Sequence, residues 1–475
     1  MRILFATPET CDFVQVGGLA AVSAALPRAL LPLADIRVVV PGYPQVRRGL
    51  ANLKIVGDSP GFAGLPSFRV GKGHATDGMP YYVVICPELF ERPGSPYSDE
   101  HGVDWQDNDV RFATFSYAAA QIALGSIDKD WSAHLVHAND WQCALIPAYL
   151  EWSQRPLPSV FTIHNLAYQG VFSRDALPRL GIPAQSFHID GVEFYNRLSL
   201  MKAGLVYASH LTTVSQTYAA EITTPEFGCG LEGILRKRAE KDELSGILNG
   251  IDESWDPRTC TALTRTFDAG DWRGRSQNAK DIRRQFGLAV SRGPLFALVA
   301  RLVHQKGVDL VIQNAKAIVD AGGQIIVTGK GEAQFEEALR QTQISHPGAV
   351  AVRIGFDDNE ARRIFAGSDF TLMPSRFEPC GLSQMYAQRF GSLPIGHRTG
   401  GLAETIQDGQ TGFLFERPSS DGLLSSLCRA FSTFGARDRL DRMRRAAMGQ
   451  AFSWTNSAKA YASIYQSSIV CRQRP

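Results

Sequence analysis

Short apolar runs alternate with helical patterns along most of this chain, and no other feature of the sequence restricts the fold as much. Runs of about four to eight residues rich in Val, Ile and Leu are typical of buried parallel strands, and a helix between two runs brings the chain back to begin the next strand. The pattern therefore predicts βαβ units. The predicted strands are residues 3–6, 36–40, 82–85, 135–137 and 159–163 in the first half, and residues 295–299, 324–327, 351–354, 370–373 and 393–395 in the second half.

The length of the chain, 475 residues, exceeds what one hydrophobic core usually supports. The strand and helix pattern lapses after residues 246–252 and then resumes. We therefore predict an α/β protein with two Rossmann-like, doubly wound domains, residues 1–245 and 246–454, and a hinge around Asn249 and Gly250. Ligands of open α/β sheets bind beyond the carboxyl ends of the strands, so two such domains should bind a ligand in the cleft between them.

The charge balance argues against several classes of partner. Lys and Arg total 49 against 47 acidic residues, a net charge of +2, which gives no reason to expect a nucleic acid or an anionic membrane as partner. The first apolar run ends at Thr7, and no later run is long enough to span a membrane, so we expect a soluble, cytoplasmic protein. The eight cysteines have neither C-x-x-C nor His/Cys ligand spacing, which argues against zinc and against a disulfide framework.

Two glycine pairs each stand between a predicted strand and a predicted helix. Gly17 and Gly18 precede a helical pattern over residues 20–31, and Gly400 and Gly401 follow Thr399 in the second half. Adjacent glycines let a phosphate approach the backbone, and a helix N-terminus favours negative charge. Each pair taken alone could simply form a tight turn. Together they predict a split site for a nucleotide sugar, because the departing diphosphate needs stabilisation.

Three charged side chains follow strands of the second domain. Arg301 and Lys306 could bind one anion without a metal, although a solvated basic loop is the alternative. Glu378 stands in a crowded loop that opens a helix, where it could cap that helix or orient sugar hydroxyls and stabilise positive charge at the anomeric carbon. No second carboxylate pairs with Glu378 by spacing, so the sequence does not indicate a two-carboxylate hydrolase.

Polar residues also follow two strands of the first domain. His137, Asp140 and Trp141 lie at the end of one strand, and His164 directly follows another. A histidine at a strand end either makes structural hydrogen bonds or contacts a substrate, and periodicity alone leaves both interpretations open.

These residues lie in segments that resemble the bacterial glycogen synthases and plant starch synthases over nearly the whole chain. The similar segments are residues 17–19, 41–43, 96–97, 104–108, 137–141, 162–170, 221–228, 248–252, 375–382 and 398–402. The resemblance implies the GT-B fold, with a final helix at about residues 455–475 that crosses back to the first domain. It also implies transfer of glucose from ADP-glucose to the 4-hydroxyl of an α-1,4-glucan with retention, without a metal or other cofactor.

The resemblance further implies roles for particular residues. His164 should contact the donor glucose, Arg301 and Lys306 the diphosphate, and Glu378 the sugar. Asn249 and Phe356 should border the nucleoside, with Phe356 standing where the family usually has a stacking Tyr. The full set of implied substrate-binding residues beside these four catalytic ones is Gln15, Gly17, Gly18, Tyr97, His137, Asp140, Trp141, Asn165, Asn249, Phe356, Cys380, Gly381, Leu382, Thr399, Gly400 and Gly401.

Two positions depart from the family pattern. The family usually has Lys at the position of Gln15 and Asp at the position of Ala21. Loss of that Lys removes a charge-assisted contact worth about 1.5 to 3 kcal/mol. A related transferase that uses UDP-glucose or a non-polymer acceptor, and a glucan-binding homologue without turnover, therefore remain as alternatives, although the retained donor-site residues favour an enzyme.

Overall fold

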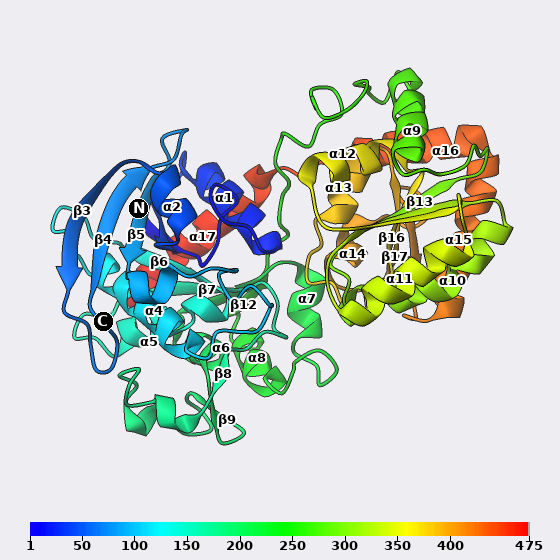
Figure 1. Ribbon diagram of the computed structural model, residues 1–475. Helices are drawn as coiled ribbons and strands as arrows, with labels where there is room; N and C mark the ends of the chain where they lie inside the picture. Colours follow the sequence, from blue (N-terminus) through cyan, green and yellow to red (C-terminus); the bar gives the residue numbers. More distant parts are fainter. Residues whose placement is uncertain (474–475) are drawn as a thin grey trace. The chain divides into compact units, whose positions relative to one another are not determined.

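The computed structural model describes residues 1–473, which form two compact units. Unit 1 comprises Met1–Gly250 and the segment that begins at Trp454, and unit 2 is Ile251–Ser453 (Figure 1). The first unit boundary thus directly follows Asn249 and Gly250, where the sequence pattern lapses. Residues 474 and 475, at the end of the expected final helix, lie outside the described residues.

The sheet of unit 1 has the strand order β12-β11-β7-β6-β1-β2-β5-β4-β3. Strands from β12 to β5 pair in parallel, whereas β5, β4 and β3 form an antiparallel meander at one edge. The predicted strands correspond to β1, β2, β5, β6 and β7, and the other four were not predicted. The strands are β1 (Arg2–Ala6), β2 (Asp35–Pro41), β3 (Ala51–Ser59), β4 (Phe68–His74), β5 (Pro80–Ile85), β6 (Leu135–Asn139), β7 (Ser159–Ile163), β11 (His210–Thr213) and β12 (Leu244–Gly246).

The helices of unit 1 pack in two groups. Helices α4 and α5 pack against each other and against the central strands, and α6 packs against α5. Helix α17, formed by the end of the chain, returns to unit 1 and packs against α1 and β7 (Figure 1). A small sheet of β8 (Val171–Phe172), β9 (Glu193–Phe194) and β10 (Arg197–Ser199) lies between β7 and α6 in the sequence. The helices are α1 (Gly18–Leu30), α2 (Pro44–Gly49), α3 (Pro87–Phe90), α4 (Asn108–Ala123), α5 (Leu145–Glu151), α6 (Leu200–Tyr207), α7 (Gln216–Glu221), α8 (Glu232–Ala239) and α17 (Trp454–Gln473).

Unit 2 is built on a fully parallel sheet of order β15-β14-β13-β16-β17-β18. The five strands predicted for the second half are β13 to β17, and only the short β18 was not predicted. The strands are β13 (Leu295–Val299), β14 (Gln324–Gly329), β15 (Val350–Ile354), β16 (Phe370–Met373), β17 (Leu393–His397) and β18 (Phe413–Phe415).

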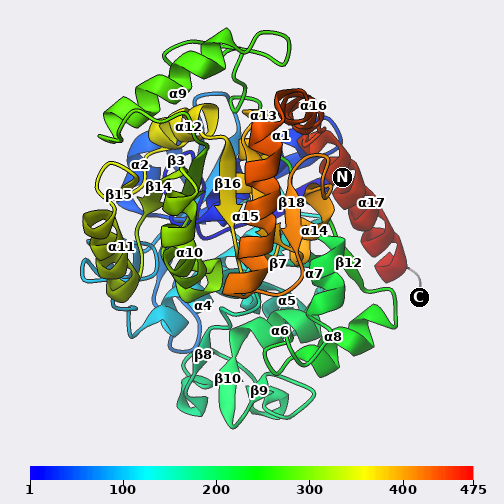
Figure 2. The ribbon, with the colours of Figure 1, turned by 90° about the vertical axis from the view of Figure 1, so that its right-hand side faces the viewer.

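Strand residues of unit 2 alternate between two hydrophobic cores. Phe296 and Leu298 pack with residues of α10, α11, α15 and α16, whereas Leu295 and Val299 pack with residues of α9, α12 and α13. Helices α10 and α15 lie side by side over the sheet (Figure 2). Because these strands are buried on both faces, their sequences are continuous apolar runs. The helices are α9 (Arg273–Gln285), α10 (Val308–Asp320), α11 (Ala333–Ser345), α12 (Asp358–Gly367), α13 (Ser383–Arg389), α14 (Gly400–Thr405), α15 (Ser420–Gly435) and α16 (Arg437–Met448).

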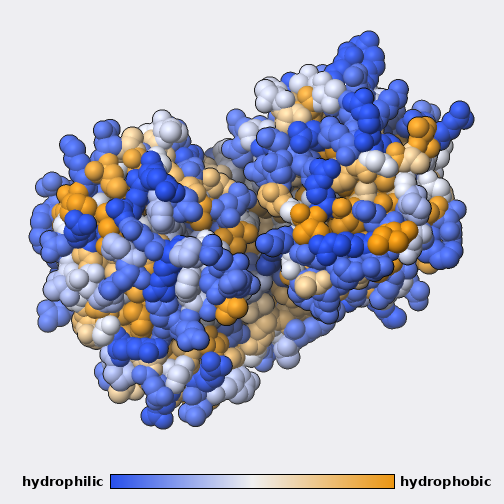
Figure 3. All heavy atoms as spheres, in the orientation of Figure 1, coloured by the Kyte–Doolittle hydropathy of each residue, from blue (hydrophilic) through white to orange (hydrophobic). Residues whose placement is uncertain are grey.

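On the face drawn in Figure 3, apolar side chains gather in small groups among hydrophilic ones. Across residues 1–473, every helix is too short or too polar to cross a membrane.

Candidate functional site

The turn between β1 and α1 is organised by a buried carboxylate. Glu9, only 4% exposed, accepts hydrogen bonds from the backbone N–H groups of Val16 (2.6 Å) and Gly17 (3.3 Å). The amide of Gly17 is therefore engaged within the protein. Gly18 is exposed and begins α1. Sequence reasoning missed Glu9, whose only signal is a carboxylate shortly after a strand and before a glycine pair.

Asp140 connects the ends of β6 and β7, which are neighbours in the sheet. Its Oδ1 accepts hydrogen bonds from the N–H groups of His164 (2.8 Å) and Asn165 (3.4 Å). Asp140 has a positive φ of 57°, a conformation that costs a non-glycine residue energy and is found mostly at functional sites. Burial raises the pKa of the Asp140 carboxyl to about 7, while the two N–H groups act in the opposite direction. The carboxylate therefore fixes the loop that carries His164.

The imidazole of His164 is held in one orientation. Its Nε2 lies 2.9 Å from Oδ1 of Asn139, whose Nδ2 donates to the carbonyl of Ala6 at 2.9 Å. Because the Asn139 amide nitrogen is the donor to Ala6, its oxygen must accept, so His164 carries its proton on Nε2. Burial lowers the pKa of His164 to about 3, which keeps the ring neutral and leaves Nδ1 as an acceptor. Asn139 is a second residue that sequence reasoning missed.

His137 lies in the core. It is fully buried, with Nδ1 2.7 Å from the Tyr465 hydroxyl of α17 and Nε2 2.6 Å from the Thr162 hydroxyl. The Phe5 ring packs edge-on against it at 4.7 Å. Both ring nitrogens are thus used to join α17 to the sheet. Of the two interpretations that the sequence left open, the structural one describes this histidine.

Tyr97 and Trp141 bring aromatic surface close to Asp140. The Tyr97 hydroxyl is near enough to Glu9 and Asp140 for their charges, together with burial, to raise its pKa well above the usual value. The Trp141 ring packs edge-on against Phe112 at 5.0 Å. A Cβ atom at Gly170 would lie 2.3 Å from that indole, so only glycine fits beside it. Unit 1 thus brings together Asp140, Trp141, His164 and Asn165 at the ends of the adjacent strands β6 and β7, with Tyr97 nearby from the segment before α4.

Lys306 and Glu378 form the central pair of unit 2. Nζ of Lys306 lies 2.5 Å from Oε2 of Glu378, and the Ser375 hydroxyl donates to the same oxygen at 2.9 Å. The Glu378 side chain is 6% exposed and that of Lys306 17% exposed. Lys306 follows β13, and Glu378 follows β16, its neighbour in the sheet. A nearly buried carboxylate is therefore held by one cation and one hydroxyl, and Ser375 is a third contributor that the sequence did not reveal.

The glycine pair of α14 allows a close backbone approach to the Glu378 loop. The N–H of Gly401 donates to the carbonyl of Glu378 at 3.0 Å, so this amide serves to position the loop. A Cβ at Gly400 would lie 2.0 Å from that carbonyl oxygen, and a Cβ at Gly401 would lie 2.0 Å from the carbonyl oxygen of Cys380. Gly400 also has a positive φ of 42°. Glycine is required at both positions by this packing, whatever ligand the turn binds.

The remaining predicted residues of this loop lie directly beside Glu378. Cys380 is buried, and Gly381 has a positive φ of 71°. The Gln384 side chain donates to the carbonyls of Cys380 (2.9 Å) and Gly381 (3.0 Å), while Leu382 precedes α13. Thr399 precedes α14 and is 1% exposed.

The remaining predicted residues are distributed over both units. Arg301 is exposed at the end of β13, and Phe356, 60% exposed, follows β15 in unit 2. Asn249 is 6% exposed at the end of the first segment of unit 1, and its buried Oδ1 has no hydrogen-bond partner in the described residues. Gln15 is exposed in the turn before α1. The described part of the chain contains no group of three or more His, Cys, Asp or Glu side chains suited to a metal ion.

Two family descriptions match the chain. The starch synthase catalytic domain matches residues 2–237, and the glycosyl transferases group 1 matches residues 279–446. Glycogen synthase 1 of Bradyrhizobium diazoefficiens is 64% identical over 455 residues, covering 96% of this chain and 98% of that protein. The glycogen synthase of Pseudomonas putida is 52% identical over 465 residues, covering 98% and 90%.

Solved structures agree with these relatives. The catalytic domain of starch synthase IV from Arabidopsis thaliana, bound to ADP and acarbose, is 30% identical, with a TM-score of 0.89 and 99% of each chain covered. A sucrose-phosphate synthase from Thermosynechococcus elongatus, 16% identical with a TM-score of 0.62, shares the fold. The polypeptide thus has the GT-B fold, and the chain belongs to the glycogen and starch synthase family of glycosyltransferases.

Proposed function

We propose that this protein is a glycogen synthase that transfers glucose from ADP-glucose to the non-reducing 4-hydroxyl of an α-1,4-glucan with retention. The observation that carries the proposal is the Lys306–Glu378 pair at the ends of adjacent strands of unit 2. Burial of a charged pair costs free energy of folding. Such a pair is therefore expected where other contacts compensate that cost or where function requires the two charges. The glycogen synthase relatives support the choice of polymer and reaction.

In unit 2, Lys306 and Arg301 are the proposed ligands of the donor diphosphate. Lys306 offers a point charge and Arg301 a planar fork, and both follow β13. Because Lys306 already contacts Glu378, the arriving diphosphate would share this cation with the carboxylate. Glu378 would then be more negative toward the sugar, where positive charge develops as the bond to the diphosphate breaks.

In unit 1, His164 is the proposed contact for the transferred glucose. Its neutral ring presents Nδ1 as an acceptor, a suitable partner for a sugar hydroxyl, and the Asp140 carboxylate and Asn139 amide fix its position. Tyr97 and Trp141 lie beside Asp140 and would supply aromatic surface to the glucan, with Asn165 as a further hydrogen-bonding group. Asn249, with its unpartnered oxygen, and Phe356, with its exposed ring, are proposed to border the adenosine.

Retention is proposed to follow a same-face mechanism. The departing phosphate accepts the proton of the acceptor 4-hydroxyl, the bond between the anomeric carbon and the phosphate oxygen breaks, and the acceptor oxygen bonds to the same face of that carbon. The positive charge that develops there is stabilised by Glu378. His137 takes no part, because both of its ring nitrogens are engaged in the core.

A donor panel tests the proposal directly. The protein is incubated with glycogen and with radiolabelled ADP-glucose or UDP-glucose, and the glucan is precipitated. We expect label in the precipitate, several-fold more from ADP-glucose, and full release of that label by an enzyme specific for α-1,4 bonds. Faster incorporation from UDP-glucose would overturn the donor assignment. A lack of label from either donor, with glucan binding retained, would instead identify a binding protein.

A further inference from the structure

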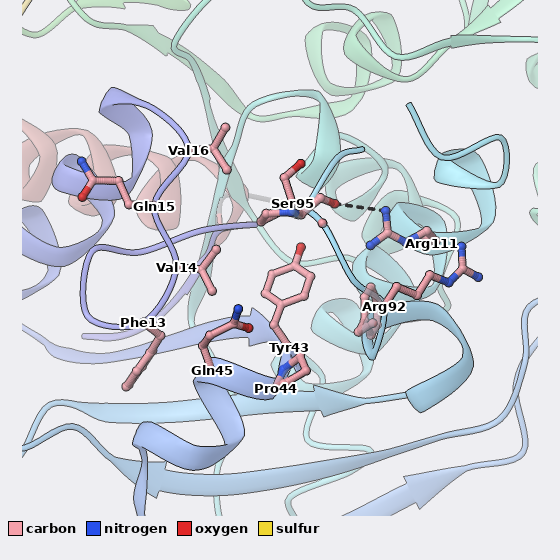
Figure 4. A pocket seen from close by; sticks show the side chains of 13 residues that line it. Phe13, Val14, Gln15, Val16, Tyr43, Pro44, Gln45, Arg92, Ser95 and Arg111 are labelled. Atoms are coloured by element: carbon pink, nitrogen blue, oxygen red, sulfur yellow. Dashed lines mark hydrogen bonds between the residues drawn. The ribbon is translucent and has the colours of Figure 1, made fainter. Parts of the chain in front are cut away.

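A cavity of about 290 Å³ lies in unit 1 beside the turn that precedes α1. Its walls include Phe13, Val16, Tyr43, Pro96 and Arg111, so it joins the β1 turn to the segment before α4 (Figure 4). The lining mixes apolar side chains with polar ones, and two of the polar groups could bind a ligand. None of the four proposed catalytic side chains lines it, although Gln15, one of the implied substrate-binding residues, does.

The first polar group is the hydroxyl of Tyr43. Tyr43 is 5% exposed, and its buried oxygen has no hydrogen-bond partner in residues 1–473. Figure 4 shows the ring directed into the space near Ser95 and Val16, with the hydroxyl at its inner end. Leaving a buried hydroxyl without a partner costs about 1 to 3 kcal/mol. A phenylalanine would fill the same volume without that cost.

The second polar group is the guanidinium of Arg111, which is only 1% exposed. Nε donates to the carbonyl of Leu89 at 2.8 Å, and Nη1 donates to the carbonyl of Pro96 at 3.0 Å and to Oδ1 of Asn108 at 2.7 Å. These three acceptors are neutral, and Nη2 has no hydrogen-bond partner in the described part of the chain. Arg111 is therefore a rigidly held, buried cation whose charge is not matched by a bound carboxylate.

Neighbouring groups stabilise this cation but do not neutralise it. The guanidinium carbon lies 5.9 Å from the ring centre of Phe90, 5.8 Å from that of Trp105 and 5.5 Å from that of Phe112. The nearby Asp107 is already paired with Arg92 through two hydrogen bonds of 2.7 Å. The Arg92–Asp107 pair has no net charge, so the cavity wall keeps the single positive charge of Arg111.

Tyr43 and Arg111 line the same cavity, so one ligand bound in it can reach both. We propose that the cavity binds a small oxyanion, a carboxylate or a phosphoryl group, that accepts hydrogen bonds from Nη2 of Arg111 and from the hydroxyl of Tyr43. A neutral sugar would leave the charge of Arg111 unmatched, whereas an oxyanion would match it.

Calorimetric titration of the full chain tests this site. Inorganic phosphate and acetate are titrated separately, with ADP present so that the proposed diphosphate contacts of unit 2 are occupied. The variant is Tyr43→Phe, and the matched control is Tyr117→Phe, a tyrosine of α4 that does not line the cavity. We expect binding to the unaltered protein and the control, and a loss of about tenfold or more in Tyr43→Phe, as for a hydrogen bond to a charged group.

Binding of phosphate alone would support a phosphoryl ligand, and binding of acetate as well would support carboxylates. In the absence of anion, Tyr43→Phe should unfold at the same or a higher temperature than the unaltered protein, because it removes an unpartnered hydroxyl. Equal affinity in Tyr43→Phe and the control, or no binding of either anion at millimolar concentration, would overturn the proposal. The test uses neither a donor sugar nor turnover. Its failure therefore leaves the proposed glucosyl transfer unaffected, and failure of the donor panel leaves the proposed anion site unaffected.

Discussion

Nζ of Lys306 lies 2.5 Å from Oε2 of Glu378, although 72 residues separate them in the chain. Parallel pairing of β13 and β16 brings the two loops together, because the carboxyl ends of neighbouring parallel strands lie at the same edge of the sheet. The pair is the part of the site on which most of the proposed chemistry depends.

The Lys306–Glu378 pair should show strong coupling in stability measurements. Lys306→Met leaves a nearly buried carboxylate without its cation and is expected to lower the free energy of unfolding by about 2 kcal/mol or more. Adding Glu378→Gln to that variant removes the uncompensated charge and should restore much of the loss. Urea denaturation of the two single variants and the double variant measures the coupling. Additive effects would show that the two side chains do not interact in solution.

The fold could be predicted well from the sequence where strands are buried on both faces. All ten predicted strands are present, since β13 and its neighbours are continuous apolar runs covered by helices on both sides. The strand β3 was not predicted, because it is largely exposed at a sheet edge and includes Lys54 and Asp58. Exposed edge strands do not show the apolar pattern on which the prediction relied.

Acidification should destabilise the protein through His137. Burial lowers its pKa to about 3 in the folded state, against about 6.5 when unfolded, so the unfolded chain binds more protons between these values. The contribution of His137 to the free energy of unfolding is therefore fully present above pH 6.5 and falls as the pH drops toward 3. Between pH 7.5 and 5.5, the protonation of His137 in the unfolded chain should lower the free energy of unfolding by about 1 kcal/mol or more. Burial raises the pKa of Asp140 and so acts in the opposite direction over pH 4 to 7.

The contribution of His137 can be isolated by comparing variants. His137→Gln should be less stable at pH 7.5 but should lose less stability than the unaltered protein between pH 7.5 and 5.5. His101→Gln, at an exposed position, serves as control and should keep the original dependence. An unchanged pH dependence in His137→Gln would contradict the assignment of a neutral, buried imidazole.

Parts of the site could not be predicted because they depend on contacts that no local pattern reveals. The resemblance implied that His137 binds substrate, and its structural role in the core could not be predicted because its partner Tyr465 is 328 residues away. Glu9 was not predicted because its carboxylate accepts hydrogen bonds from backbone N–H groups. Backbone N–H groups occur in every sequence, so they leave no recognisable pattern. By contrast, Lys306 and Glu378 were found because each is a charged residue in a loop that follows a predicted strand.

Glu9 should control the rigidity of the turn before α1. Glu9→Ala leaves the N–H groups of Val16 and Gly17 without their acceptor and is expected to cost about 1 to 3 kcal/mol. Hydrogen exchange followed by mass spectrometry should show faster exchange in peptides covering residues 14–19. Glu100→Ala, at an exposed position, is the control. Exchange in Glu9→Ala as slow as in the control would show that the carboxylate does not organise the turn.

Gly401 should tolerate no side chain. A Cβ atom there would lie 2.0 Å from the carbonyl oxygen of Cys380, so Gly401→Ala must displace the loop that carries Glu378. We expect a loss of stability of about 1 to 3 kcal/mol and a fall in turnover of at least tenfold. Gly435→Ala in α15, where an added Cβ meets nothing within 4 Å, is the matched control. Normal turnover in Gly401→Ala would show that the loop position is not critical.

We propose that Glu378 stabilises the charge that develops on the sugar, and the decisive measurement is the turnover of Glu378→Gln with ADP-glucose and glycogen. The substitution keeps the size of the side chain and removes its charge. We expect the rate to fall about a hundredfold or more, equivalent to about 3 kcal/mol, with donor affinity changed by only a few-fold. Glu337→Gln, on the exposed surface of α11, should retain full activity. Turnover of Glu378→Gln close to that of this control would contradict the account.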